Sequence, residues 1–139
     1  FEGWCWGVKA QNASQLKLPI NTLEKTQDTD GTWRGYVNQQ LQDHYQPLYQ
    51  YINYWVVLQA PSFDCVYQWR LEQEEKLANA THMSSTNKVM SPTQVSEFIQ
   101  YFQRLTEHGL ATLGASANAV LTLDNKRNVI NFTGEVNNG

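Results

Sequence analysis

Residues 54–61 read YWVVLQAP, a short aromatic and β-branched run that a proline brings to an end. Such a continuous apolar run predicts a buried strand, because strands that are covered on both faces lose the alternation of half-exposed strands. The residues that follow, from 62 to about 79, predict a helix with Ser62 or Asp64 as its N-cap. The stretch therefore predicts the strand–loop–helix unit from which parallel α/β sheets are built.

Upstream of this unit, residues 8–32 show no steady apolar period and predict irregular structure, apart from a short helix capped by Asn21 three residues before Glu24. From 33 to 52 the period becomes helical, since the apolar residues step by three or four. Pro47 sits inside that pattern and predicts a kink or break near residues 45–46.

Downstream, Ser91 and Pro92 predict the start of a helix that reaches about Leu110. Residues 119–123 predict a further strand, and residues 129–132 predict a short strand that pairs back across a turn. We therefore predict one α/β domain over residues 1–139, with about three or four strands and flanking helices. That is few strands for a parallel sheet, and it indicates an incomplete fold with further strands upstream.

Composition narrows the class of protein. The chain has 139 residues, of which 41% are hydrophobic and 17% charged, as in a globular domain. The net charge of −3 argues against a nucleic-acid partner, and no apolar run approaches the roughly 20 residues that span a bilayer. We expect no nucleic acid and no membrane partner. Cys5 and Cys65 are expected to be buried free thiols in a reducing cytoplasm.

The opening residues, FEGWCWG at 1–7, begin without an initiator Met. A bulky apolar residue, a carboxylate and a glycine are typical of the end of a buried parallel strand at an active-site edge, where α/β proteins bind ligands. Glu2 is therefore a candidate acid on the magnesium side of a nucleotide site, with the rest of that site expected upstream. The alternative is that Glu2 has no role in a site.

Two helical pairs carry possible site chemistry. Arg70 and Glu74 lie four residues apart, so they share a helix face. They are either a solvated pair or an arginine that neutralises a transferring phosphate. Arg34 and Asn38 have the same spacing and are either a surface pair or ligands of a small anion or hydroxylated substrate. In both cases spacing alone favours the structural interpretation.

A third pair, Tyr101 and Arg104, lies on the flank of the later helix and has the same two interpretations: a partly buried aromatic beside a solvated charge, or contacts to an acceptor or lid. No phosphate-cradling GxxxxGK[ST] or GxGxxG motif occurs in the sequence, and no GxSxG nucleophile motif.

Together these segments resemble the D-glycerate 3-kinase group of P-loop kinases, which are similar to uridine kinase and phosphoribulokinase. The resemblance extends from 1 to about 132 and rests on FEGWC (1–5), PINTLE (19–24), DTDGTWRGYVN (28–38), LQAPSF (58–63), VYQWRLEQE (66–74) and FIQYFQRLT (98–106). It implies an incomplete parallel-sheet P-loop kinase fold that uses ATP and Mg²⁺ on a small-molecule acceptor, D-glycerate. It implies Glu2 as the magnesium-side acid and Arg70 as the lid arginine, with the phosphate loop upstream.

Arg34, Asn38, Tyr101 and Arg104 are the weaker candidates for acceptor or lid contacts. We expect the chain by itself to be inactive, because it lacks a phosphate loop. Two other functions stay open. One is a non-catalytic binding module on a kinase-like scaffold, whose gene would start near Phe1. The other is a homo-oligomer that associates or swaps through an exposed sheet edge.

Overall fold

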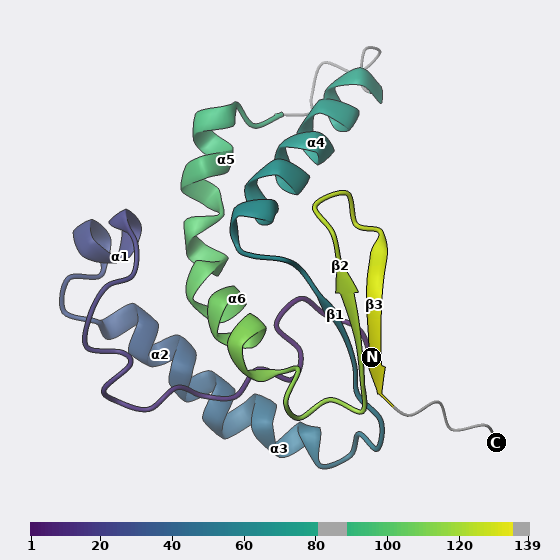
Figure 1. The fold of residues 1–139 in the computed structure, drawn as a ribbon. Coiled ribbons are helices and arrows are strands. Elements are labelled where there is room, and N and C mark those ends of the chain that lie inside the picture. Colours follow the sequence, from purple (N-terminus) through teal and green to yellow (C-terminus); the bar gives the residue numbers. More distant parts are fainter. Residues whose placement is uncertain (81–88, 135–139) are drawn as a thin grey trace.

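The computed structural model describes residues 1–80 and 89–134 and shows an α/β arrangement of helices beside a three-stranded sheet (Figure 1). The elements, in chain order, are α1 (Thr22–Gln27), α2 (Thr32–Gln40), a π-helical turn (Leu41–Tyr45), α3 (Gln46–Tyr49), β1 (Val56–Gln59), α4 (Asp64–Ala80), α5 (Pro92–Phe98), α6 (Gln100–Thr112), β2 (Ala119–Leu123) and β3 (Val129–Gly134). Within these residues no helix is both long and apolar enough to cross a membrane.

The sheet has the order β1-β2-β3 and is mixed. β1 and β2 are parallel, with Val56 opposite Ala119 and Gln59 opposite Thr122. β2 and β3 form an antiparallel hairpin, whose turn is closed by a bond from Asp124 N–H to Asn128 O. The α/β class, the parallel pair and the returning strand are thus confirmed. The connection between β1 and β2 contains α4, α5 and α6, since parallel strands need a long connection.

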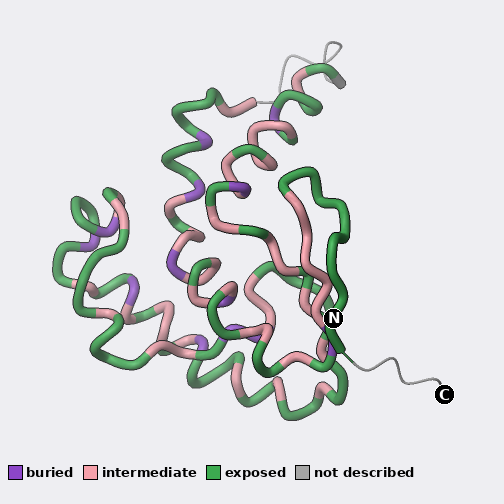
Figure 2. The backbone as a smooth tube through the Cα atoms, viewed as in Figure 1, coloured by how far each residue is buried: buried purple, intermediate pink, exposed green. Residues whose placement is uncertain are grey.

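Only one face of β1 is covered in the part of the chain that the structure describes. Val56 and Leu58 are 53% and 65% exposed, whereas Val57 and Gln59 between them are half-buried. The Gln59 side-chain amide donates to the Leu110 carbonyl of α6, so this face meets the helices. All of β3 is exposed (Figure 2). Strands of a parallel sheet are ordinarily buried on both faces, so the described sheet has an uncovered side.

The helical segment that leads into β1 changes its hydrogen-bond pattern near the residues where the sequence predicts a kink or break. The Gln46 N–H bonds to Leu41 O, five residues back, at the end of the π-helical turn. Pro47 follows at once and lacks an N–H, so the normal ladder cannot continue through it. The widened turn accommodates the proline, and α3 begins immediately afterwards. The chain stays helical through residues 45–46, so the irregularity predicted there is a change from π-helical to α-helical bonding and not a break.

The helix predicted from 92 to about 110 is two helices, α5 and α6, separated by Ile99. Its start is as expected: the Ser91 side chain accepts from Gln94 N–H, and the Gln94 side chain accepts from Ser91 N–H, which completes a capping box. At Ile99 the chain tightens, because Phe102 N–H bonds to Ile99 O, three residues back.

The interior of the described residues contains almost as many charged as apolar side chains. The buried apolar residues are Val8, Leu41, Cys65, Val95, Ile99 and Ala119. The buried charged residues are Glu24, Asp28, Arg34, Glu74 and Arg104. Charged side chains are seldom buried unless they are paired, so each of these needs an identified partner.

Candidate functional site

Glu2 lies in a segment that the structure does not place in the sheet. Residues 1–3 belong to no strand, and Phe1 stacks on Trp6 with their ring centroids 5.6 Å apart. The predicted strand end at 1–3 is therefore not observed, because a strand needs a neighbour for its backbone groups and the described sheet offers none there. Glu2 is exposed, and residues 1–80 and 89–134 contain no cluster of three metal-ligating side chains. Its magnesium-side role stays a prediction.

Arg104 is not solvated on the flank of α6; its guanidinium is buried and bonded to Glu24 and to two backbone carbonyls, an arrangement that we call a clamp. Its Nε and Nη2 donate to the two carboxylate oxygens of Glu24 at 2.7 and 2.6 Å, and Nη1 and Nη2 donate to the carbonyls of Gln15 and Leu18. Burial works to raise the pKa of Glu24, but hydrogen bonds from Arg104 and from Ile20 N–H, with the Arg104 charge, hold that pKa below its usual value.

Arg34 forms a second clamp from α2. Its Nη1 donates to the Asp28 carboxylate at 2.9 Å, and its Nε donates to the Leu16 carbonyl at 2.7 Å. The same Asp28 carboxylate accepts the N–H groups of Trp33 and Arg34, so it also caps the first turn of α2. Arg34 is only 6% exposed, so it does not form the surface pair that the sequence favoured.

Asn38 faces the same irregular segment. The Asn38 side-chain amide accepts from Gln11 N–H and donates to Gln11 O. It thus satisfies both backbone groups of Gln11, as a neighbouring β-strand would. Arg34, Asn38 and Arg104 thus all bind the backbone of residues 11–18. Tyr101 does not join them, because it is 58% exposed. Contacts of these four residues with an acceptor stay a prediction.

Arg70 differs from the other two arginines because part of its guanidinium remains available. The side chain is 34% exposed. Its Nη2 donates to Glu74 Oε1 at 2.5 Å, its Nη1 donates to Gln73, and its Nε has no hydrogen-bond partner among the described residues. The guanidinium carbon lies 5.4 Å from the centre of the Phe98 ring on α5. Glu74 is only 3% exposed, so the solvated pair expected from the spacing is not observed.

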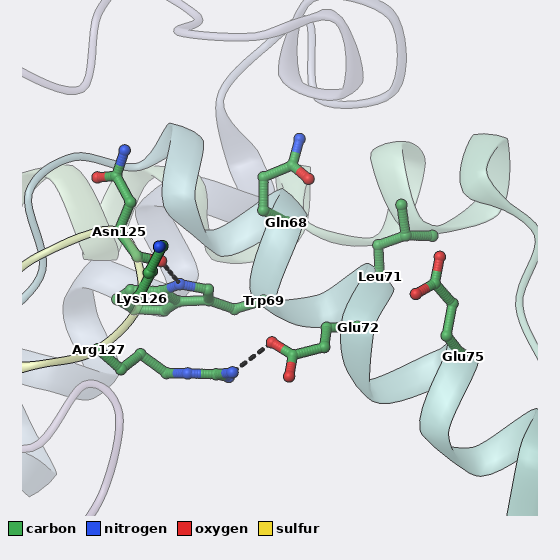
Figure 3. Close-up of a pocket in the computed structure, with 8 residues that line it drawn as sticks. All are labelled: Gln68, Trp69, Leu71, Glu72, Glu75, Asn125, Lys126 and Arg127. Carbon is green, nitrogen blue, oxygen red and sulfur yellow. Dashed lines mark hydrogen bonds and ion pairs between the residues drawn. The ribbon is translucent and has the colours of Figure 1, made fainter.

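A groove of about 410 Å³ lies between α4 and the turn that follows β2 (Figure 3). The turn is docked on the helix: Trp69 Nε1–H donates to Asn125 O at 2.8 Å, and Arg127 pairs with Glu72 and lies over the Trp69 ring. The groove is lined by Gln68, Trp69, Leu71, Glu72, Glu75, Asn125, Lys126 and Arg127. It lies just beyond the carboxyl end of β2, which is the edge where open α/β sheets bind ligands.

Sequence reasoning missed this groove, and also the burial of Glu74. Trp69 lay inside a segment that was singled out only for Arg70 and Glu74. The turn at 124–128 carried only a turn signal, with no sign that it would dock on a helix 56 residues away in sequence. The order of the predicted strands could have indicated the groove, since loops that follow parallel strands gather at one edge of the sheet.

The arrangement of helices and strands matches part of two larger solved structures. A D-glycerate 3-kinase from Cryptococcus neoformans var. grubii superposes with a TM-score of 0.69 at 21% identity, over 97% of this chain and 49% of that one. The YGR205w protein gives a TM-score of 0.56 at 21% identity, over 94% of this chain and 45% of that one. At these identities the likeness establishes the fold, which matches part of the larger kinase fold.

Sequence comparison supports a relationship to kinases. The uncharacterised kinase mug58 of Schizosaccharomyces pombe is 34% identical over 113 residues, 81% of this chain and 38% of the relative. The chloroplastic D-glycerate 3-kinase of Arabidopsis thaliana is 28% identical over 130 residues, 89% of this chain and 25% of the relative. No protein-family model matches the chain. The chain is similar to kinases of the glycerate 3-kinase-like group, and it spans less than half of the length of these two relatives.

Proposed function

We propose that the chain is part of an ATP-dependent kinase that passes the γ-phosphate of MgATP to a small hydroxylated acceptor, D-glycerate. The observation that carries this proposal is the sequence relationship, which includes one relative named as a D-glycerate 3-kinase. The cytoplasm is the proposed location, because Cys5 and Cys65 are both free thiols.

Arg70 fits one part of this chemistry. Phosphoryl transfer spreads negative charge over the equatorial oxygens of the moving group, and catalysis consists mainly of positioning and charge stabilisation. A guanidinium with unused N–H groups suits those oxygens, because its fork matches their geometry. Arg70 retains such groups on Nη1 and Nη2, each of which commits one bond, whereas its Nε–H is unpaired but buried. When bound, MgATP supplies the phosphoryl group and the metal charge; Arg70 supplies a cation fixed to α4.

Among residues 1–80 and 89–134, we identify no other part of an ATP site. Its sequence contains no phosphate-cradling glycine-rich motif, and the described residues contain no cluster of metal ligands. Glu2, the one predicted metal-side group, is exposed. We therefore expect the 139-residue chain by itself to show no phosphoryl transfer, although a protein that contains it can still be a kinase.

The test is a coupled assay of ADP release, made with D-glycerate and with other small alcohols. The protein expressed from the complete coding sequence is compared with the 139-residue chain. We expect turnover only from the former, and we expect Arg70→Ala to lower kcat by about 10³-fold or more, the effect of losing a phosphate-stabilising arginine. The matched control is Lys76→Ala, which removes an exposed cation from the same helix.

Three results would count against this function. Turnover by the 139-residue chain alone contradicts the expected dependence on a phosphate loop. An unchanged kcat in Arg70→Ala removes the lid role. No turnover from the complete protein with any acceptor favours the alternative of a non-catalytic binding module on a kinase scaffold.

A second candidate, self-association, is favoured by the uncovered side of the sheet. Val56 and Leu58 point away from the helices and are largely exposed, and among the described residues β1 pairs only with β2. An open strand edge beside exposed apolar side chains is a template for pairing with another chain. We propose this as a property of the 139-residue chain, to be measured by light scattering.

A further inference from the structure

Glu74 is a buried carboxylate with a different partner on each oxygen. Oε1 accepts from Arg70 Nη2 at 2.5 Å, and Oε2 accepts from the backbone N–H of Met90 at 2.9 Å. Arg70 lies one turn earlier on α4, whereas Met90 lies just before Ser91, the N-cap of α5. One side chain therefore links the arginine to the point where the chain enters the next helix.

Arg70 is held from the side of α5 as well. Its guanidinium lies against the ring of Phe98, the last residue of α5, at a distance suited to a cation–π contact. Gln73 of α4 accepts from Nη1. The guanidinium is thus fixed by α4 through Glu74 and Gln73, and by α5 through Phe98.

We propose that Glu74 is a positioning residue, which fixes Arg70 relative to both α4 and α5 so that the arginine meets the transferring phosphate without a change of rotamer. This inference rests on the proposed kinase function. If Arg70 swung away, Glu74 would stay buried with its charge uncompensated, and that is strongly unfavourable. Arg70 therefore moves with the α4–α5 pair as one unit, and its unused N–H groups keep a constant direction.

The kinetic test uses a double-mutant cycle in the protein expressed from the complete coding sequence. Glu74→Gln removes the charge at nearly constant shape, and we expect kcat to fall about 10- to 100-fold with little change in KM for ATP, since a small misplacement of a catalytic group has effects of that size. In the Arg70→Ala background the same substitution is expected to have no further effect. The matched control is Glu97→Gln, an exposed carboxylate on α5, which is expected to leave kcat unchanged.

A second measurement needs no turnover and uses the 139-residue chain. In ¹⁵N-labelled protein the Arg70 Nε–H is buried, so its NMR signal is expected to be sharp and slow to exchange with water. Glu74→Gln is expected to broaden that signal and to accelerate its exchange at least tenfold, while Glu97→Gln changes neither. If Glu74→Gln does not fold, as judged by circular dichroism, Glu74→Asp replaces it, because the shorter side chain cannot reach both partners.

The outcomes separate the two proposals. A wild-type complete protein without turnover overturns the kinase function but leaves the NMR result to decide whether Glu74 fixes Arg70. A kcat loss of equal size with and without Arg70, or an Arg70 signal that Glu74→Gln leaves unchanged, overturns the positioning role even where the kinase is active.

Discussion

Replacing Arg104 by Met is expected to destabilise the chain by about 3–5 kcal/mol, which is the cost of breaking a buried ion pair from one side. Arg104 contributes four hydrogen bonds: two to Glu24, one to Gln15 O and one to Leu18 O. Without the guanidinium, the buried Glu24 carboxylate keeps one hydrogen-bond donor among those described, the backbone N–H of Ile20.

The expected loss of stability depends on how deeply the ion pair is buried, so an exposed ion pair provides the control. The side chains of Arg104 and Glu24 are about one tenth exposed, whereas Lys76, which pairs with Glu72 on α4, is 72% exposed. Lys76→Met should cost far less, because exposed helical pairs contribute little to stability. Combining Arg104→Met with Glu24→Leu should recover most of the loss, because an apolar pair of similar volume needs no buried charge.

Urea unfolding at pH 7, followed by far-UV circular dichroism, measures these differences in the free energy of unfolding. Limited trypsin digestion adds a local measurement, since Lys17 lies between the two carbonyls that Arg104 holds. We expect faster cleavage after Lys17 in Arg104→Met than in Lys76→Met. An Arg104→Met loss below about 1 kcal/mol, with unchanged cleavage, would refute the view that this buried pair holds the segment.

Three further predictions follow from single residues. The pKa of Glu24 is lower in the folded state than its usual value of 4.5. The contribution of Glu24 to stability is therefore present above pH 4.5 and is lost as the pH falls through the lower folded pKa. Urea midpoints measured from pH 7 down to 3 should fall more steeply in wild type than in Arg104→Met. Gly134→Ala should destabilise the β2–β3 hairpin, because φ is +143° and a Cβ would lie 2.4 Å from Asn118 O; thermal unfolding that is unchanged would contradict this. Leu58→Lys, which charges the exposed face of β1, should reduce any self-association that light scattering detects, and an equal mass for both proteins at high concentration would argue against the edge contact.

Much of the fold could be predicted because its signals are local. The apolar run at 54–59, the caps Asn21 and Ser91, and the proline at 47 each act within a few residues, and each appears in the structure near where the sequence placed it. The break at Ile99 could not be predicted, because the apolar period continues through it and the change is confined to one turn.

The partners of the charged residues could not be predicted, because most of them are distant in the sequence. Glu24 and Arg104 are 80 residues apart, and nothing in the spacing of either helix indicates that they meet. Helical spacing correctly placed Glu74 beside Arg70, but it could not show that the Met90 N–H covers the same carboxylate. Periodicity shows which residues share a face of one helix; it does not show what packs against that face.

The three arginines proposed from the sequence are distinguished by their unused donors rather than by their spacing. A guanidinium has five N–H groups. Arg104 commits four bonds to Glu24 and to two carbonyls, and Arg34 is similarly engaged with Asp28 and with the backbone of residues 16–17. Arg70 commits two and is partly exposed. Arg34 and Arg104 are buried and use most of their donors, so an anion can bind them only by displacing partners that also hold a loop in place. Arg70 is therefore the one of these three that can meet a phosphate at little structural cost. The same reasoning gives the buried carboxylates distinct roles, since Glu24 secures a loop whereas Glu74 holds a cation that still has donors to offer.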